Sequence, residues 1–125
     1  MKLSSLLIAL CCTALLHAQS GSEIMLFALG WNNGGPVLKN GTNITNHPGY
    51  DNQPYFMMGG RYWDILYTSF NDSGRADIKA YDIAKKTTRN ITTTHDREYS
   101  PTLTPDGKHI SCILQRDNGV QDLVQ

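Results

Sequence analysis

The sequence predicts an all-β protein built from copies of one antiparallel unit, and three observations carry this prediction. Part of the sequence repeats at an interval of 47 residues. Short runs rich in β-branched and aromatic residues alternate with clusters of Gly, Pro, Asn and Asp, the pattern of strands joined by tight turns. Beyond the first 18 residues the apolar positions show no helical period.

The chain begins with a short apolar segment. Lys2 gives it a positive start, Leu3 to Leu16 is almost entirely apolar, and Ala18 stands where a leader peptidase would cut. Such a segment is typical of a secretory signal peptide and is short for a membrane span, with a buried N-terminal helix as the alternative. We therefore expect residues 1–18 to be a helical leader. The product, residues 19–125, would be periplasmic or secreted and not an integral membrane protein.

Composition excludes several classes of partner and of scaffold. The chain has 125 residues, 40% of them hydrophobic, and its 11 basic and 11 acidic residues cancel. A neutral balance gives no electrostatic basis for binding nucleic acid. Cleavage after Ala18 would leave Cys112 as the sole cysteine, so we expect no internal disulfide.

The repeat is marked by Asn43-Ile44-Thr45, which returns as Asn90-Ile91-Thr92. After a two-residue deletion, Gly74 corresponds to Gly119 and the interval becomes shorter. An earlier partial copy, Glu23–Leu29, matches the pattern of Asp77–Ile83. We thus expect a partial unit at 22–46, a complete unit at about 47–92 and a partial unit at about 93–125. The 47-residue interval also links Asp51 with Glu98, Pro54 with Pro101, Gly60 with Gly107, and Ile65 with Cys112.

Each complete unit is predicted to hold four strands. The expected strands are Pro54–Met58, Trp63–Ser69, Asp77–Ile83 and Thr87–Thr92, then Pro101–Thr104 and Ile110–Gln115. Pro105, Asp106 and Gly107 predict a tight hairpin turn, because proline presets its first position and glycine accepts the left-handed one. Gly60 keeps the glycine of the earlier copy without the proline, so that turn should be looser.

Four strands per 40–50 residues, with a turn every 8–12, predict the blades of a β-propeller, which must stack to cover their faces. The segment Asn43–Pro54, with Pro105–Lys108 and Asp77–Asp82, resembles the TolB-type propeller repeat and the related N-terminal propeller of dipeptidyl-peptidase-IV-like enzymes. The resemblance covers about residues 22–125. It implies a closed ring of six or more blades, of which this chain holds about two and a half. A fragment is therefore expected, with an oligomer that completes the ring as the alternative.

In such a topology the loops that enter the first strands lie at the mouth of the central channel. The repeated carboxylates Asp51 and Glu98 could hold a cation or a basic peptide group there, or could instead bond their own loops. His47 and His95 stand near each other in the repeat, but they lack short ligand spacing, so no metal or other cofactor is expected. The candidate binding-face residues are Tyr50, Asp51, Asn52, Gln53, Arg97, Glu98 and Tyr99.

No nucleophile elbow, zinc-protease motif or phosphate-binding loop occurs in the sequence. The leading expectation is an exported, non-catalytic propeller, similar to TolB, that binds another protein or a peptide. The first alternative is the N-terminal propeller of a dipeptidyl-peptidase-IV-like serine peptidase. A carbohydrate-binding or lyase propeller is a further alternative, and it would need a histidine-rich metal cluster.

Overall fold

The computed structural model describes residues 21–57 and 64–125, and within them the chain is all-β, as predicted. The leader expected at 1–18 and the looser turn expected around Gly60 lie outside the described residues. Pairing begins earlier than predicted in the first strands, at Asp51 and Arg97, because loop residues before each proline also join the ladder. The strands are β1 (Met25–Asn32), β2 (Gly35–Asn43), β3 (Asp51–Met57), β4 (Asp64–Phe70), β5 (Ala76–Asp82), β6 (Thr87–Asn90), β7 (Arg97–Leu103), β8 (Ile110–Gln115) and β9 (Gln121–Val124).

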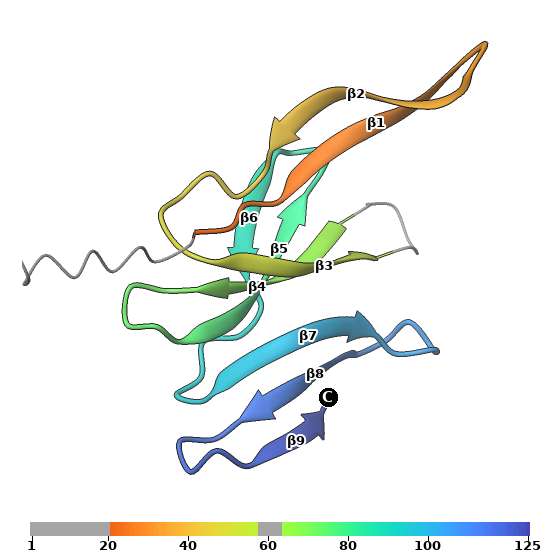
Figure 1. Cartoon of the computed structure of the whole chain (residues 1–125). Helices are drawn as coiled ribbons and strands as arrows, with labels where there is room; N and C mark the ends of the chain where they lie inside the picture. The colour runs from red at the N-terminus through yellow and green to blue at the C-terminus, as the bar shows by residue number, and fades with distance from the viewer. Residues whose placement is uncertain (1–20, 58–63) are drawn as a thin grey trace, which may run out of the picture.

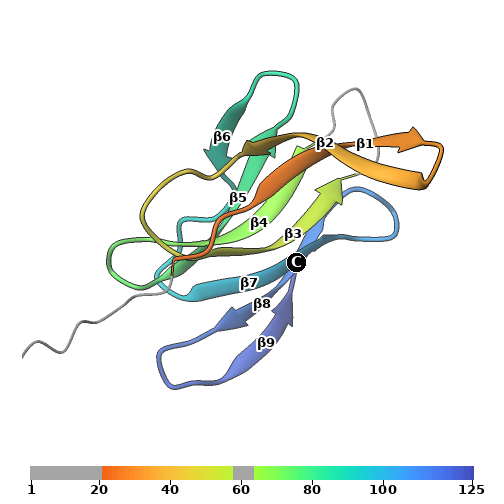
Figure 2. The ribbon, with the colours of Figure 1, turned by 45° about the horizontal axis from the view of Figure 1, so that its top comes forward.

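These strands form three small antiparallel sheets that follow one another along the chain (Figure 1). The first sheet is β1-β2, the central sheet is β3-β4-β5-β6, and the last sheet is β7-β8-β9. The central sheet lies between the other two, as the turned view also shows (Figure 2). Each sheet falls within one of the three segments into which the repeat divides the sequence.

The repeated Asn-Ile-Thr makes the same backbone bonds in both copies. The N–H of Ile44 donates to the carbonyl of Ile24 at 3.0 Å, and the N–H of Ile91 donates to the carbonyl of Ile78 at 2.8 Å. The hydroxyl oxygens of Thr45 and Thr92 accept the N–H groups of Ile24 and Ile78 in return. Ile24 and Ile78 are therefore equivalent, and β1-β2 of the first sheet correspond to β5-β6 of the central sheet.

The first strands of the central and last sheets, β3 and β7, share a bulge at equivalent positions. The ladder of β3 shifts between Asn52 and Tyr55, and that of β7 shifts between Tyr99 and Thr102. Gln53 and Ser100, which lie in these bulges 47 residues apart, have φ angles of 53° and 52°. Positive φ is uncommon for residues other than glycine and is a usual feature of bulges. The central and last sheets thus share this bulge as well as their order of strands.

The two-residue deletion lies in a different place from the one predicted. Met57 pairs with Asp64 in the central sheet, whereas its counterpart Thr104 pairs with His109, so the first hairpin of the last sheet is two residues shorter. The alignment of Ile65 with Cys112 is therefore wrong, and the counterpart of Cys112 is Tyr67. A slip of two residues keeps each side chain on the same face of a strand, so the apolar pattern alone could not reveal it.

Two apolar clusters join the sheets. The first consists of Ile24 and Ile44 from the beginning and end of the first sheet, packed on Ile65, Tyr67 and Tyr81 of the central sheet. The second joins the opposite face of the central sheet to the last sheet, and its buried members are Leu66, Ile78, Ala80 and Cys112. Burying one large aliphatic side chain stabilises a fold by about 1.5–3 kcal/mol, so these clusters hold the stack together.

The predicted turn after β7 is present. The N–H of Gly107 donates to the carbonyl of Thr104 at 2.8 Å, and Gly107 takes the left-handed conformation with φ of 69°. The Asp106 carboxylate accepts the N–H of Lys108 and the hydroxyl of Thr104. These hydrogen bonds lower the pKa of Asp106, that from Thr104 being the main cause. Pro105 precedes Asp106 in this turn, where its fixed φ suits the second residue of a turn.

Candidate functional site

The loops that enter β3 and β7 lie at the same end of their sheets as the turns after β4 and β8. Asp51 pairs with Ser69, and the N–H of Phe70 donates to the carbonyl of Tyr50 at 3.0 Å. Arg97 pairs with Gln115 in the last sheet in the same way. This end carries all seven predicted binding-face residues, so each can be placed by its exposure and its contacts.

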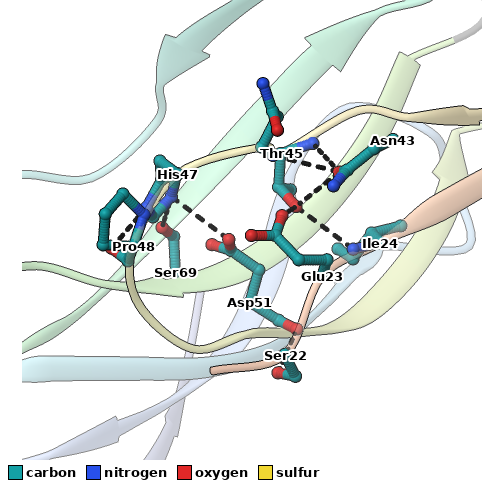
Figure 3. Close-up of polar contacts among 10 residues, drawn as sticks. Ser22, Glu23, Ile24, Asn43, Thr45, His47, Pro48, Asp51 and Ser69 are labelled. Carbon is teal, nitrogen blue, oxygen red and sulfur yellow. Dashed lines mark hydrogen bonds and ion pairs between the residues drawn. The ribbon is translucent and has the colours of Figure 1, made fainter. Parts of the chain in front are cut away.

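The two repeated carboxylates point inward. Asp51 is 2% exposed and Glu98 is 1% exposed. Glu98 accepts hydrogen bonds from the hydroxyls of Thr92 and Thr94, both in the loop that leads to its own strand. Asp51 faces the Nε2 atom of His47 at 3.1 Å, again within its own loop (Figure 3). Both side chains therefore face their own loops and are covered from solvent, but only Glu98 accepts hydrogen bonds there, since neither carboxylate oxygen of Asp51 has a hydrogen-bond partner among the described residues.

His47 also contacts its own loop. Its Nδ1 lies 2.8 Å from the carbonyl oxygen of Pro48, and its Nε2 lies 3.4 Å from the hydroxyl of Ser69 (Figure 3). Asp51 and Ser69 thus share one ring nitrogen, whereas a serine–histidine–aspartate relay needs the two partners on opposite nitrogens. This arrangement does not have the geometry that would activate Ser69 as a nucleophile.

His47 and His95 are not counterparts in the structure. The residue that faces Glu98 as His47 faces Asp51 is Thr94, whereas His95 lies beside Arg75 and Asp117. Within residues 21–57 and 64–125, no three His, Cys, Asp or Glu side chains gather closely enough to hold a metal ion.

The first sheet holds a related polar contact. The hydroxyl of Thr45 donates to the Glu23 carboxylate at 2.5 Å while accepting the N–H of Ile24 (Figure 3). The bond from Thr45 lowers the pKa of Glu23. Ser22 is joined to the start of β3, since its hydroxyl donates to the carbonyl of Asp51 at 2.7 Å. These bonds anchor the start of the first sheet to the loop that leads into β3.

Three aromatic rings, one exposed and two half-buried, lie next to one another at this end. Tyr50 meets Phe70 edge to face with ring centroids 5.5 Å apart, and Phe70 lies 6.0 Å from the ring of Tyr99. The three rings form a row from the central sheet to the last one. Tyr50 is 36% exposed. Arg97 begins β7, and its guanidinium lies 3.8 Å from Asp117 in a partly exposed ion pair.

A pocket of about 410 Å³ opens beside Tyr99. Ligand pockets commonly measure about 300–1,000 Å³, so this one suits part of a small molecule or a few residues of a peptide. It has one apolar side chain and no charged one, so it offers hydrogen bonds without net charge. The residues that line it are Gln53, Tyr99, Ser100, Ile113, Gln115 and Gln121.

Gln53 lines the pocket and also shows how neighbouring units of the repeat contact each other. Its side-chain carbonyl accepts the hydroxyl of Thr68 at 2.9 Å and the backbone N–H of Ser100 at 2.8 Å. The Gln53 side chain of β3 thus binds the backbone of β7 at the bulge of β7. Ser100 is itself the counterpart of Gln53, so the last sheet presents an equivalent position with no strand lying over it among the described residues.

The pocket is therefore the place that β7 fills one sheet earlier. On the central sheet, Tyr99 and Ser100 of β7 lie over Phe70 and Gln53. The counterparts of these two covered residues on the last sheet are Gln115 and Ser100, and both line the pocket. The corresponding surface of the central sheet already binds an extended, bulged strand, which makes the pocket a candidate site for another such strand.

Of the predicted residues, only Gln53 and Tyr99 line this pocket. Tyr50 belongs to the adjacent aromatic row, and Asn52 is half-buried with its side-chain oxygen lacking a hydrogen-bond partner. Ser100 lies beside Tyr99 in the predicted loop, and the other three lining residues, Ile113, Gln115 and Gln121, were not predicted from the sequence. Their repeat counterparts are Thr68, Phe70 and Ala76, and the contacts that these make could only be known from the structure.

No known protein family, curated protein or solved structure matches the chain. Across the described ranges, 21–57 and 64–125, no helix has the length and apolar character needed to cross a membrane.

Proposed function

We propose that this chain is part of an exported β-propeller of the TolB-like type, which acts as a non-catalytic binding protein. Three antiparallel sheets packed face to face, with repeated hydrogen bonds, support a propeller architecture. The apolar start of the sequence supports export. The site that supports binding is the uncharged pocket between β3 and β7–β9.

The preferred ligand of this pocket is an extended strand, whether of a partner protein or of a further unit of the propeller. One observation carries this proposal: the bond from the N–H of Ser100 to the Gln53 side chain, which shows how this surface receives a strand. On the last sheet, Ser100, Gln115 and Gln121 offer amide and hydroxyl groups to a peptide backbone, and Ile113 offers an apolar floor. Amide and hydroxyl groups pair with a backbone whatever its side chains are, so sequence specificity would come from the aromatic row beside the pocket.

The chain itself supplies a probe. A synthetic peptide covering residues 94–104 contains β7, the strand that occupies the equivalent position on the central sheet. We expect the fluorescently labelled peptide to bind the purified chain, with a rise in anisotropy that saturates. A peptide with an N-methyl group on Ser100 is the control, because it cannot donate the N–H that Gln53 accepts on the central sheet and that its counterpart, the Ser100 side chain, would accept on the last sheet; it should bind more weakly by about tenfold.

The protein is varied in parallel. Ile113→Asp places a charge on the floor of the pocket, at a partly exposed position, and should abolish peptide binding while leaving the fold intact. Val120→Asp makes the same kind of change in the turn between β8 and β9 and should leave binding unchanged. Failure of the peptide to bind the chain, or equal binding to the Ile113→Asp variant, would remove the basis of the proposal.

A further inference from the structure

The first hairpin is longer than its counterpart in the central sheet. The last pair of the β5-β6 hairpin is Asp82 with Thr87, and the equivalent pair of the β1-β2 hairpin is Ala28 with Lys39. Residues 29–38 form four more pairs beyond this point. At about 3.3 Å per residue they lengthen the hairpin by about 13 Å, and its tip projects past the ends of β5 and β6 (Figure 1). We call residues 29–38 the hairpin extension.

The extension carries large apolar side chains on one face. Leu29 pairs with Leu38, and Trp31 follows two residues after Leu29, so the three side chains point to the same side. They are 66–72% exposed. The central sheet does not reach this far, because Ala28, two residues after the packed Leu26 and on the same side, is already exposed. A sheet of the same length on the opposite side would not reach the extension either, so the length of the hairpin leaves these side chains in solvent.

Two side chains brace the hairpin from within. A Cβ atom at Gly41 would lie 2.5 Å from the Phe27 ring, and one at Gly30 would lie 2.9 Å from the Lys39 side chain. Each of these side chains therefore rests directly against the backbone of the opposite strand, where only glycine leaves room for it. A braced hairpin loses less conformational entropy when its apolar face binds a surface.

The extension lies in a part of the sequence without carboxylates. Between Glu23 and Asp51 there is no acidic residue, and Lys39 is the only lysine or arginine. Lys39 is exposed and stands at the base of the extension. The hairpin is therefore positive, although the formal net charge of the chain is zero.

These features fit the surface of an anionic lipid bilayer. Tryptophan concentrates at membrane interfaces, because its ring is apolar while its N–H is polar. The turn at the tip is polar, but the Asn32 side chain accepts the N–H of Gly34 at 2.9 Å, which lowers the cost of moving the turn out of bulk water. A basic residue at the base would meet the lipid phosphates. A protein partner would explain the apolar face alone, whereas a negatively charged surface also explains the missing carboxylates.

We propose that the hairpin extension binds an anionic membrane surface, with Leu29, Trp31 and Leu38 in the interfacial region and Lys39 at the level of the lipid phosphates. The contact is peripheral, since the extension is too short to cross a bilayer. It goes beyond the proposed binding function and does not depend on it. The extension and the pocket beside Ser100 lie at opposite ends of the sheets, so a membrane-bound chain keeps the pocket open.

Flotation with lipid vesicles tests this contact. The exported form expected from the sequence, residues 19–125, is mixed with vesicles of phosphatidylcholine and phosphatidylglycerol, or of phosphatidylcholine alone. We expect saturable binding to the anionic vesicles and about two- to fivefold weaker binding to the neutral ones. Lys39→Gln should remove this preference without changing binding to neutral vesicles. Leu29→Asp should weaken binding to both by at least about tenfold.

Leu123→Asp is the matched control, because Leu123 is 75% exposed but lies on the last sheet, away from the extension. It should bind vesicles like the wild type. Equal binding of the Leu29→Asp variant, loss of binding in the Leu123→Asp variant, or a wild-type chain that binds neither kind of vesicle would overturn the proposal, and the last result would assign the apolar face to a protein contact instead.

A second measurement needs no charged substitution and so guards against failure to fold. A polarity-sensitive dye attached to a Leu38→Cys variant should shift its emission to shorter wavelength when anionic vesicles are added. The same dye on Val120→Cys, an exposed position in the turn between β8 and β9, should not shift. Equal shifts at the two positions would contradict binding through the extension.

Discussion

Replacing Ile78 with alanine tests the packing between the central and last sheets. Ile78 is fully buried in the second cluster with Leu66, Ala80 and Cys112. The change removes three carbon atoms, worth about 2.4 kcal/mol at about 0.8 kcal/mol each, and the space left behind adds to this loss. We expect the free energy of unfolding to fall by about 3–4 kcal/mol. The backbone bonds of Ile78 to Ile91 and Thr92 do not involve the side chain and should survive.

Leu123 supplies the matched comparison, because it occupies the same position in the last sheet but is 75% exposed. Leu123→Ala should change the free energy of unfolding by no more than about 0.5 kcal/mol. The assay is urea unfolding at a concentration low enough to keep the chain monomeric, with the slope against denaturant shared between variants. Equal losses for the two substitutions would refute the assignment of Ile78 to a covered face and of Leu123 to an open one.

The turn after β7 and the buried thiol give the remaining predictions. Gly107→Val should lower the free energy of unfolding by about 1–2 kcal/mol, because Gly107 has a φ of 69° that a β-branched residue adopts only with strain. Gly34→Val in the first hairpin is the control and should cost less. Equal losses in thermal unfolding would contradict the turn geometry. The lowered pKa of Asp106 means that its hydrogen bonds stabilise the chain above its ordinary pKa of 3.8 and are lost as the pH falls through the lower folded value. Asp106→Asn should therefore flatten the acid limb of a stability–pH curve, and an unchanged limb would argue against these bonds. Burial first, and then the charge of Glu98, raises the pKa of Cys112, so site-resolved mass spectrometry should show labelling at least about tenfold slower than in the urea-unfolded chain.

The strands were predicted from turn residues and strand propensity, which depend on neighbouring residues and can therefore be read from the sequence. Tight turns need particular residues, so Pro105, Asp106 and Gly107 were enough to predict one hairpin. The shared Asn-Ile-Thr sequence correctly identified equivalent strands, because the threonine hydroxyl and the isoleucine backbone take part in the same bonds in each copy. The number of units followed from this repeat.

The candidate site was predicted only in part. The sequence located the loops that contain Gln53 and Tyr99, but it also singled out Asp51 and Glu98 for their charge. Whether a repeated carboxylate faces solvent or its own loop depends on the path of the preceding residues. His47 and Thr94, which have unrelated chemistry, turn out to serve Asp51 and Glu98 in the same position. The 47-residue interval does pair His47 with Thr94, but their unlike side chains give no sign in the sequence that both contact the carboxylate four residues on.

The sequence by itself determined that this protein is a set of antiparallel units with strands and turns at particular places, because strand propensity and turn geometry depend on neighbouring residues. Only the tertiary structure decided which faces meet and where the repeat loses two residues. The physical reason is the two-residue period of a strand, which lets Cys112 align with Ile65 or with Tyr67 without changing sides. The position of the pocket follows from that packing, because it depends on which side of each sheet a neighbouring sheet covers.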